Sequence, residues 1–264
     1  MYAFTYHQPT NLSAALADLT AEDSKALAGG QTLLPTMKQR LAAPTSLVDL
    51  TKVAELSGIK QEGETIVIGA MTRHGDVATS ATVHKAIPAL AALAGLIGDP
   101  AVRNRGTIGG SLANNDPAAD YPAAALALGA TIVTSKREIA AEAFFKGLFE
   151  TALEDGEIIV KVRFPIPQAA AYEKFRNPAS RFALVGVFVA KTAGGPRVAV
   201  TGAGASGVFR AKALETALGS GFAAASLNGV THPATGLNTD LHADAAYRAH
   251  LIVVLAKRAV AAAR

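Results

Sequence analysis

Two glycine-centred segments of the chain carry residue types that suit the binding of phosphate groups. They read Leu27-Ala28-Gly29-Gly30-Gln31-Thr32-Leu33-Leu34 and Arg105-Gly106-Thr107-Ile108-Gly109-Gly110-Ser111-Leu112-Ala113-Asn114. Glycine has no Cβ, so backbone N–H groups in such a segment approach and surround a phosphate. Thr32, Thr107 and Ser111 add hydroxyl donors. A lone Gly-Gly pair more often marks a turn, but two such loops that meet in space predict a grip on the two phosphates of a dinucleotide.

Acidic residues follow the second segment, at Asp116 and Asp120. Asp116-Pro117 fits a turn, and Asp120 fits a helix cap. A carboxylate just after a phosphate loop also suits hydrogen bonds from ribose hydroxyls or from a ring N–H. The sequence leaves both interpretations of Asp120 open.

A third glycine pattern, Gly202-x-Gly204-x-x-Gly207, matches the dinucleotide fingerprint G-x-G-x-x-G in its letters. The strand predicted before it belongs to an antiparallel hairpin rather than to a βαβ unit. No acidic residue stands at the distance that suits a ribose. We therefore interpret this pattern as a structural turn.

The chain has no cysteine. This excludes disulfides, a cysteine nucleophile, a thiolate zinc site, an iron–sulfur cluster held by cysteines of this chain, and a cysteine-linked cofactor. The six histidines are dispersed along the sequence. We find no convincing nucleophile or acid–base set, and we predict no catalytic side chain and no metal site.

Length and composition predict a globular protein of one large domain or two small ones, and the order of the strands and helices expected below predicts an α+β architecture. Of the 264 residues, 50% are hydrophobic and 17% are charged, which is enough apolar material for a core. The net charge is only +4 and the basic residues are scattered, which argues against nucleic-acid binding. No signal peptide is visible, and the apolar stretches fall short of the roughly 20 residues of a membrane helix. We expect a cytoplasmic protein with no transmembrane segment.

The elements expected from residue patterns place both glycine segments beside regular structure. The first follows a short predicted strand, and the second lies in an irregular stretch predicted over 98–122. The predicted helices span 12–19, 83–97, 121–128, 209–218 and 243–262. The predicted strands span 25–28, 46–50, 65–70, 130–134, 157–164, 182–192 and 197–201, the last two as an antiparallel hairpin. Pro165-Ile166-Pro167 marks the best domain boundary.

With their flanks, the two glycine segments resemble the FAD-binding medium subunit of molybdenum hydroxylases, the family that includes carbon monoxide dehydrogenase and xanthine dehydrogenase. The resemblance covers nearly the whole chain, and the pair of loops at this interval is specific where either loop alone is not. It rests on Ala28 to Lys38, Thr107 to Asn114, Asp116-Pro117, Asp120, Phe4-x-Tyr6-His7-x-Pro9, Leu47 to Leu50, Ile68 to Thr72, Arg103 to Thr107 and Tyr172-Glu173-Lys174.

This resemblance implies an FAD-binding domain of the vanillyl-alcohol-oxidase (PCMH) type over residues 1–167, with subdomains of about 1–57 and 58–167. A C-terminal domain of antiparallel sheet and helices, over 168–264, would complete the flavin pocket. The dinucleotide would lie between the two subdomains. FAD would be bound non-covalently, because the chain has no cysteine and neither loop contains a histidine.

The resemblance also assigns FAD contacts to matching positions of this chain. Asp120 would bind polar groups of FAD, and Ile159 and Lys174 align with flavin-contacting positions near the domain junction. Phe182 aligns with a residue that covers the flavin, although an ordinary core position is the other interpretation. The pyrophosphate and the adjoining ribityl chain would be held by the backbone of Leu27, Ala28, Gly29, Gly30, Gln31, Thr32, Leu33 and Leu34 and of Thr107, Ile108, Gly109, Gly110 and Ser111. Gln31-Thr32 and Ser111 depart from the His-Ser and Asn that are frequent in relatives, but they keep hydrogen-bonding groups.

The function implied is that of a redox subunit in a dimer of heterotrimers. A large subunit would oxidise substrate at a molybdenum cofactor, and a small subunit would pass electrons through [2Fe–2S] clusters to FAD in this chain. An external acceptor, which the sequence does not identify, would take them. Two alternatives are a self-contained flavin oxidase, for which about 97 residues after Pro167 make a modest substrate cap, and a flavin-free scaffold.

Overall fold

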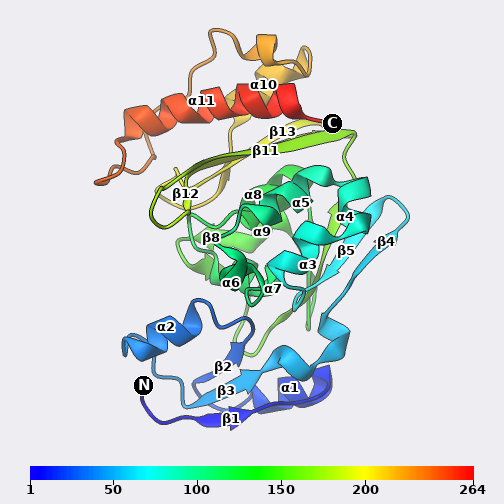
Figure 1. Cartoon of the computed structure of the whole chain (residues 1–264), viewed down its shortest axis with the longest axis vertical. Coiled ribbons are helices and arrows are strands. Elements are labelled where there is room, and N and C mark those ends of the chain that lie inside the picture. Colours follow the sequence, from blue (N-terminus) through cyan, green and yellow to red (C-terminus); the bar gives the residue numbers. More distant parts are fainter.

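The computed structural model describes all residues 1–264, which form three tiers (Figure 1). The N-terminal tier is a parallel three-stranded sheet in the order β1-β3-β2, flanked by two helices. Its small core joins Ala15 of the first helix to Val48 and Leu50. The elements are β1 (Thr5–His7), α1 (Leu12–Asp18), β2 (Ser24–Leu27), α2 (Leu33–Lys38) and β3 (Ser46–Asp49), followed by 3-10 turns at Leu50–Lys52 and Ala54–Leu56.

The middle tier contains an antiparallel five-stranded sheet in the order β4-β5-β10-β6-β7. Its strands are β4 (Ile59–Glu62), β5 (Thr65–Gly69), β6 (Thr131–Thr134), β7 (Glu138–Ala140) and β10 (Ile159–Pro165), and β8 (Phe145–Gly147) and β9 (Glu150–Thr151) form a separate hairpin. Its helices are α3 (His74–Thr79), α4 (Ala81–Ala86), α5 (Pro88–Gly95), α6 (Pro100–Arg103), α7 (Ile108–Asn114), α8 (Tyr121–Leu128) and α9 (Ala141–Phe144).

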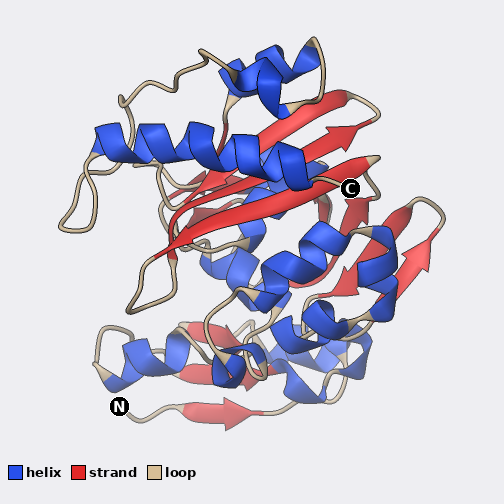
Figure 2. Cartoon of the chain, turned by 45° about the horizontal axis from the view of Figure 1, so that its top comes forward, coloured by secondary structure: helices blue, strands red, loops and turns tan.

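The C-terminal tier is an antiparallel sheet in the order β11-β12-β13-β14. Figure 2 shows the long helix α11 lying along one face of this sheet, while α5 and α8 of the middle tier pack on the other face. The elements are β11 (Ala169–Arg176), β12 (Ala183–Thr192), β13 (Gly195–Thr201), β14 (Phe209–Arg210), α10 (Lys212–Gly219), a 3-10 turn at Ala224–Leu227 and α11 (Ala245–Ala262).

Strand β12 is hydrophobic on both faces because both faces are covered. Successive side chains of a strand point to opposite faces. Val187 and Val189 join the cluster formed with α10 and α11, whereas Phe188 and Ala190 join the core of the middle tier. The two-sided burial explains why 182–192 reads as a continuous apolar run instead of an alternating one.

Three sequence predictions of elements are wrong in detail. The helix predicted over 83–97 is two helices, since Pro88 begins α5 and Ile87 is not helical. The stretch predicted as irregular over 98–122 contains α6 and α7. Residues 209–210 pair with β13 as β14, so the predicted 209–218 helix begins only at Lys212.

Other expectations are confirmed. The 182–192 and 197–201 segments form the predicted antiparallel hairpin. Gly202 and Gly207 adopt positive φ angles of 82° and 97° in the bend after β13, as a structural turn requires. No helix is both long enough and apolar enough to cross a membrane.

Candidate functional site

A cleft of about 690 Å³ lies where the three tiers meet. The residues that line it include most of both glycine segments, four residues of the stretch before and into β10 (Leu153, Glu157, Ile158 and Ile159), and part of the loop between β11 and β12. A second hollow of about 490 Å³ adjoins it and shares Ala28, Gly29, Met71 and Thr107. The glycine segments therefore line both of these adjoining hollows.

The first glycine segment leaves β2 and presents unpaired backbone donors. The N–H groups of Gly29, Gly30, Gln31 and Thr32 donate to no protein acceptor, and all four residues line the cleft. A Cβ at Gly29 would overlap the carbonyl oxygen of Arg105, so this position has no room for a side chain. Consecutive free N–H groups on a cavity wall form a cradle for an anion.

The second glycine segment contains α7, and the backbone N–H groups of Ile108 to Ser111 in the first turn of that helix are already used. Thr107 caps the helix, because its Oγ1 accepts from the Gly110 N–H at 3.1 Å. The N–H groups of Ile108, Gly109 and Ser111 donate to backbone oxygens of the protein. A Cβ at Gly110 would lie 3.0 Å from Thr107 Oγ1 and 3.5 Å from the Ala28 Cβ. The two segments are thus in contact. The second segment offers a ligand a backbone that it can approach closely, rather than a row of free N–H groups.

Asp120 joins the middle tier to the C-terminal sheet. Its carboxylate accepts hydrogen bonds from the Tyr172 hydroxyl and from Lys174 Nζ, the latter at 2.9 Å. Lys174 Nζ also donates to the Leu96 carbonyl at 3.2 Å. Asp120 occupies the N-cap position of α8, but its side chain makes no cap hydrogen bond, so the capping interpretation is wrong.

Burial governs the electrostatics of this group. The side chains of Asp120 and Lys174 are 4% and 2% exposed. Burial raises the pKa of Asp120, and the Lys174 charge opposes that rise. Burial and the Asp120 charge together raise the pKa of Tyr172 well above its ordinary value, so this hydroxyl stays a hydrogen-bond donor.

The remaining predicted site residues divide into two groups. Ile159 lines the cleft, and so does Phe182. Phe182 precedes β12 and is 51% exposed, which makes the core interpretation of this residue wrong. Leu27, Leu34 and Ile108 do not line the cleft, and the Ile108 side chain is fully buried in the core of the middle tier.

His74, which sequence analysis did not single out, also lines the cleft. It is 5% exposed, its Nδ1 is buried without a hydrogen-bond partner, and its ring packs tilted against Tyr121 at 5.4 Å. Burial, with the nearby Arg103 charge, lowers the pKa of His74 to about 4. No local sequence pattern marks His74 as a residue of the cleft wall, because a single histidine at a helix start is common.

The buried His74 makes stability depend on pH. Its pKa is about 4 when folded and about 6.5 when unfolded, so the unfolded chain binds more protons between these values. The contribution is complete above pH 6.5 and is lost as the pH falls toward 4, by about 3 kcal/mol in all. Denaturant titrations at several pH values check this. The His74→Leu variant should lose that part of the acid sensitivity, and equal pH slopes in both proteins would contradict the assignment.

Comparisons with known proteins agree with this geometry. Residues 2–167 match the family described as the FAD binding domain in molybdopterin dehydrogenase. The carbon monoxide dehydrogenase medium chain of Hydrogenophaga pseudoflava is 37% identical, over 98% of this chain and 96% of that one. The corresponding chain of Afipia carboxidovorans is 35% identical, over 99% and 97%. A chain of quinoline 2-oxidoreductase from Pseudomonas putida 86 superposes with a TM-score of 0.88 at 31% identity, over 99% and 96%.

The chain therefore belongs to the family of FAD-binding domains of molybdopterin dehydrogenases, and it has the PCMH-type fold of an oxidoreductase medium subunit. FAD is the cofactor of this family. The cleft suits such a group, because four free N–H groups stand on its wall and a side chain at Gly29 or Gly110 would crowd the loops.

Proposed function

We propose that this chain is the FAD-carrying electron-transfer subunit of a molybdenum-containing dehydrogenase complex. In that role it takes electrons from the [2Fe–2S] clusters of a partner subunit and passes them to an external acceptor. Bound FAD accepts electrons singly and releases them in pairs. The observation that carries the proposal is the cleft with its row of free N–H groups, in a chain that shares nearly its full length with medium chains of carbon monoxide dehydrogenase.

We assign the binding roles as follows. The free N–H groups of Gly29 to Thr32 hold the pyrophosphate, and Gly110 allows it to lie against α7. The Asp120–Lys174 pair and Ile159 shape the flavin end, with Phe182 at its mouth. The FAD domain would comprise residues 1–167, with subdomains of about 1–57 and 58–167, and the C-terminal domain 168–264. The short turn between β10 and β11 supports that boundary.

We propose that FAD is held without a covalent bond. The sequence has no cysteine, and the one histidine on the cleft wall, His74, is almost fully buried. Acid precipitation of the purified yellow protein should release the flavin to the supernatant. Flavin that stays with the precipitate would contradict the non-covalent assignment, and a colourless protein that takes up no added FAD would instead favour a flavin-free scaffold.

We propose that the partners are a large molybdenum-cofactor subunit and a small [2Fe–2S] subunit, in a cytoplasmic dimer of heterotrimers. The absence of a catalytic set from this chain supports the division of labour. Co-expression with these two subunits, followed by sizing and by metal and flavin analysis, tests it. A chain that stays monomeric and oxidises a small substrate alone would instead be a self-contained flavin oxidase.

Substitution of Phe182 tests whether its ring covers the flavin at the mouth of the cleft. Because the side chain is 51% exposed, Phe182→Ala should change the free energy of unfolding by only about 0.5 kcal/mol. If the ring covers the flavin, its loss admits water, shifts the visible flavin spectrum and the reduction potential, and alters the rate of reoxidation by acceptor. Unchanged spectrum, potential and reoxidation in the folded variant would show that Phe182 does not cover the ring.

A further inference from the structure

We propose that Arg137 and Glu157 are positioning residues: their ion pair holds one wall of the cleft in place and thereby sets the affinity for FAD through the position of that wall. The inference rests on the proposed location of FAD in the cleft. The wall in question is the segment 152–159, which joins β9 to β10.

This wall has little support from regular structure. Leu153, Glu157, Ile158 and Ile159 line the cleft, yet residues 153–158 belong to no helix or strand. Pairing of β10 with β6 begins at Ile159, and its register shifts between Ile159 and Lys161. Such an irregularity re-aims side chains and weakens the ladder locally. The position of the wall must therefore depend on hydrogen bonds and ion pairs outside the regular sheet ladder.

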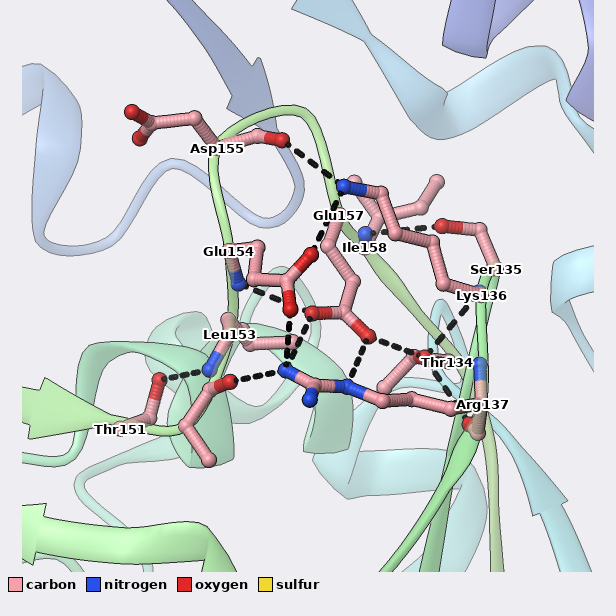
Figure 3. Close-up of polar contacts among 11 residues, drawn as sticks. Thr134, Ser135, Lys136, Arg137, Thr151, Leu153, Glu154, Asp155, Glu157 and Ile158 are labelled. Atoms are coloured by element: carbon pink, nitrogen blue, oxygen red, sulfur yellow. Dashed lines mark hydrogen bonds and ion pairs between the residues drawn. The ribbon is translucent and has the colours of Figure 1, made fainter.

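Glu157 and Arg137 supply those contacts (Figure 3). The Glu157 side chain is fully buried and accepts from four donors: Thr134 Oγ1 at 2.5 Å, Glu154 N at 2.8 Å, and Arg137 Nη2 and Nε at 3.1 and 3.2 Å. Arg137 Nη2 also donates to the Ala152 carbonyl at 2.7 Å. A single guanidinium thus ties the start of the segment to its end.

The turn that carries Arg137 is itself tied to the wall. The Ser135 N–H donates to the Ile158 carbonyl at 2.9 Å, and the Ile158 N–H donates to Ser135 Oγ at 3.3 Å. Lys136 Nζ donates to Glu154 at 3.1 Å. The segment is therefore fastened to the β6–β7 turn at both its backbone and its side chains, and Figure 3 shows these contacts converging.

The charges of Arg137 and Glu157 explain why the loss of one partner should move this wall of the cleft. Burial alone would raise the pKa of Glu157, but the hydrogen bonds from Arg137 and Thr134 outweigh it and the pKa is lowered. Without the Arg137 guanidinium, the buried Glu157 carboxylate keeps only neutral donors. The response that costs the least free energy is for the segment to move so that water reaches the carboxylate. Such a movement displaces Ile158 and Ile159, which face the cleft.

The test compares two single variants of the full chain. Arg137→Met removes this pair, and Arg163→Met removes the more exposed Arg163–Glu138 pair on strands β10 and β7 of the same sheet. Arg163 does not line the cleft. FAD titration of the apoprotein and the visible spectrum of the bound flavin are the first readouts, with hydrogen exchange of residues 152–158 in the apoprotein as the second.

Arg137→Met should weaken FAD binding by about tenfold or more, alter the flavin spectrum and speed exchange over 152–158, whereas Arg163→Met should stay within about twofold of wild type. Arg137→Lys should restore part of the affinity. If Arg137→Met does not fold, Glu157→Gln, which keeps the shape, should show the same changes more weakly. Wild-type affinity, spectrum and exchange in a folded variant would overturn the proposal. Failure of the wild-type chain to bind FAD would instead refute the proposed function. The exchange data would still show whether the ion pair holds residues 152–158 in place.

Discussion

Gly110→Val is expected to abolish FAD binding while the protein still folds. Gly110 lies in the first turn of α7 and on the cleft wall, with ordinary helical backbone. Its Cβ would already stand 3.0 Å from Thr107 Oγ1 and 3.5 Å from the Ala28 Cβ, and we expect the two branches of valine to extend into the space assigned to the dinucleotide. Replacing a helical glycine by valine improves helix propensity by less than about 0.5 kcal/mol, which offsets a small part of the crowding. Flavin content of the purified protein is the measurement.

Gly219→Val provides the matched control. Gly219 ends α10, far from the cleft lining, and an added Cβ there meets no atom within 4 Å. This variant should retain its flavin. If Gly110→Val bound FAD as wild type does, the dinucleotide would not lie against α7 and the loop assignment would be wrong.

Lys174→Met is expected to destabilise the protein by about 3–5 kcal/mol, because it leaves the buried Asp120 carboxylate without its cation. Asp120 is 4% exposed and keeps only the Tyr172 hydroxyl as a donor in this variant. The bond spans the middle tier and the C-terminal sheet, so its loss should also loosen the flavin end of the cleft. Denaturant unfolding of the apoprotein measures the change.

The double variant Asp120→Asn, Lys174→Met separates the charge from the packing. It removes the uncompensated carboxylate, so it should be more stable than Lys174→Met alone, and the double-mutant cycle should give a coupling free energy of at least about 1 kcal/mol. Additive effects of the two substitutions would show that the pair is not coupled.

Local sequence signals identified the glycine pairs that line the cleft, but they did not predict every strand that positions them. The Gly29-Gly30 and Gly109-Gly110 pairs are visible in the sequence. An added Cβ would overlap backbone atoms at Gly29 and Gly109, and Gly30 adopts a positive φ of 71°. The β12–β13 hairpin is visible because two apolar runs flank a short turn. Strand β11 was missed, since Ala169 to Arg176 has no β-branched residue and its extended form comes from pairing with β12.

Contacts between residues that are far apart in the chain leave no recognisable pattern in the sequence. Asp120 and Lys174 are 54 positions apart, and Arg137 and Glu157 are 20 apart on segments with no common period. His74 reads as an ordinary residue at a helix start. Even within the glycine loops, the sequence did not distinguish the free N–H groups of the first from the occupied ones of the second, because that difference depends on Ala70 and Thr72 of a separate segment.

The most direct test of the central claim is electron transfer into this chain. The isolated chain, loaded with oxidised FAD, is mixed anaerobically with the reduced iron–sulfur subunit of its complex while the visible flavin band is followed. We predict that the flavin band bleaches as the iron–sulfur absorption returns, and that Gly110→Val, without flavin, leaves the clusters reduced. A wild-type flavin that stays oxidised beside the reduced clusters, in a mixture where the two subunits bind each other, would contradict the account.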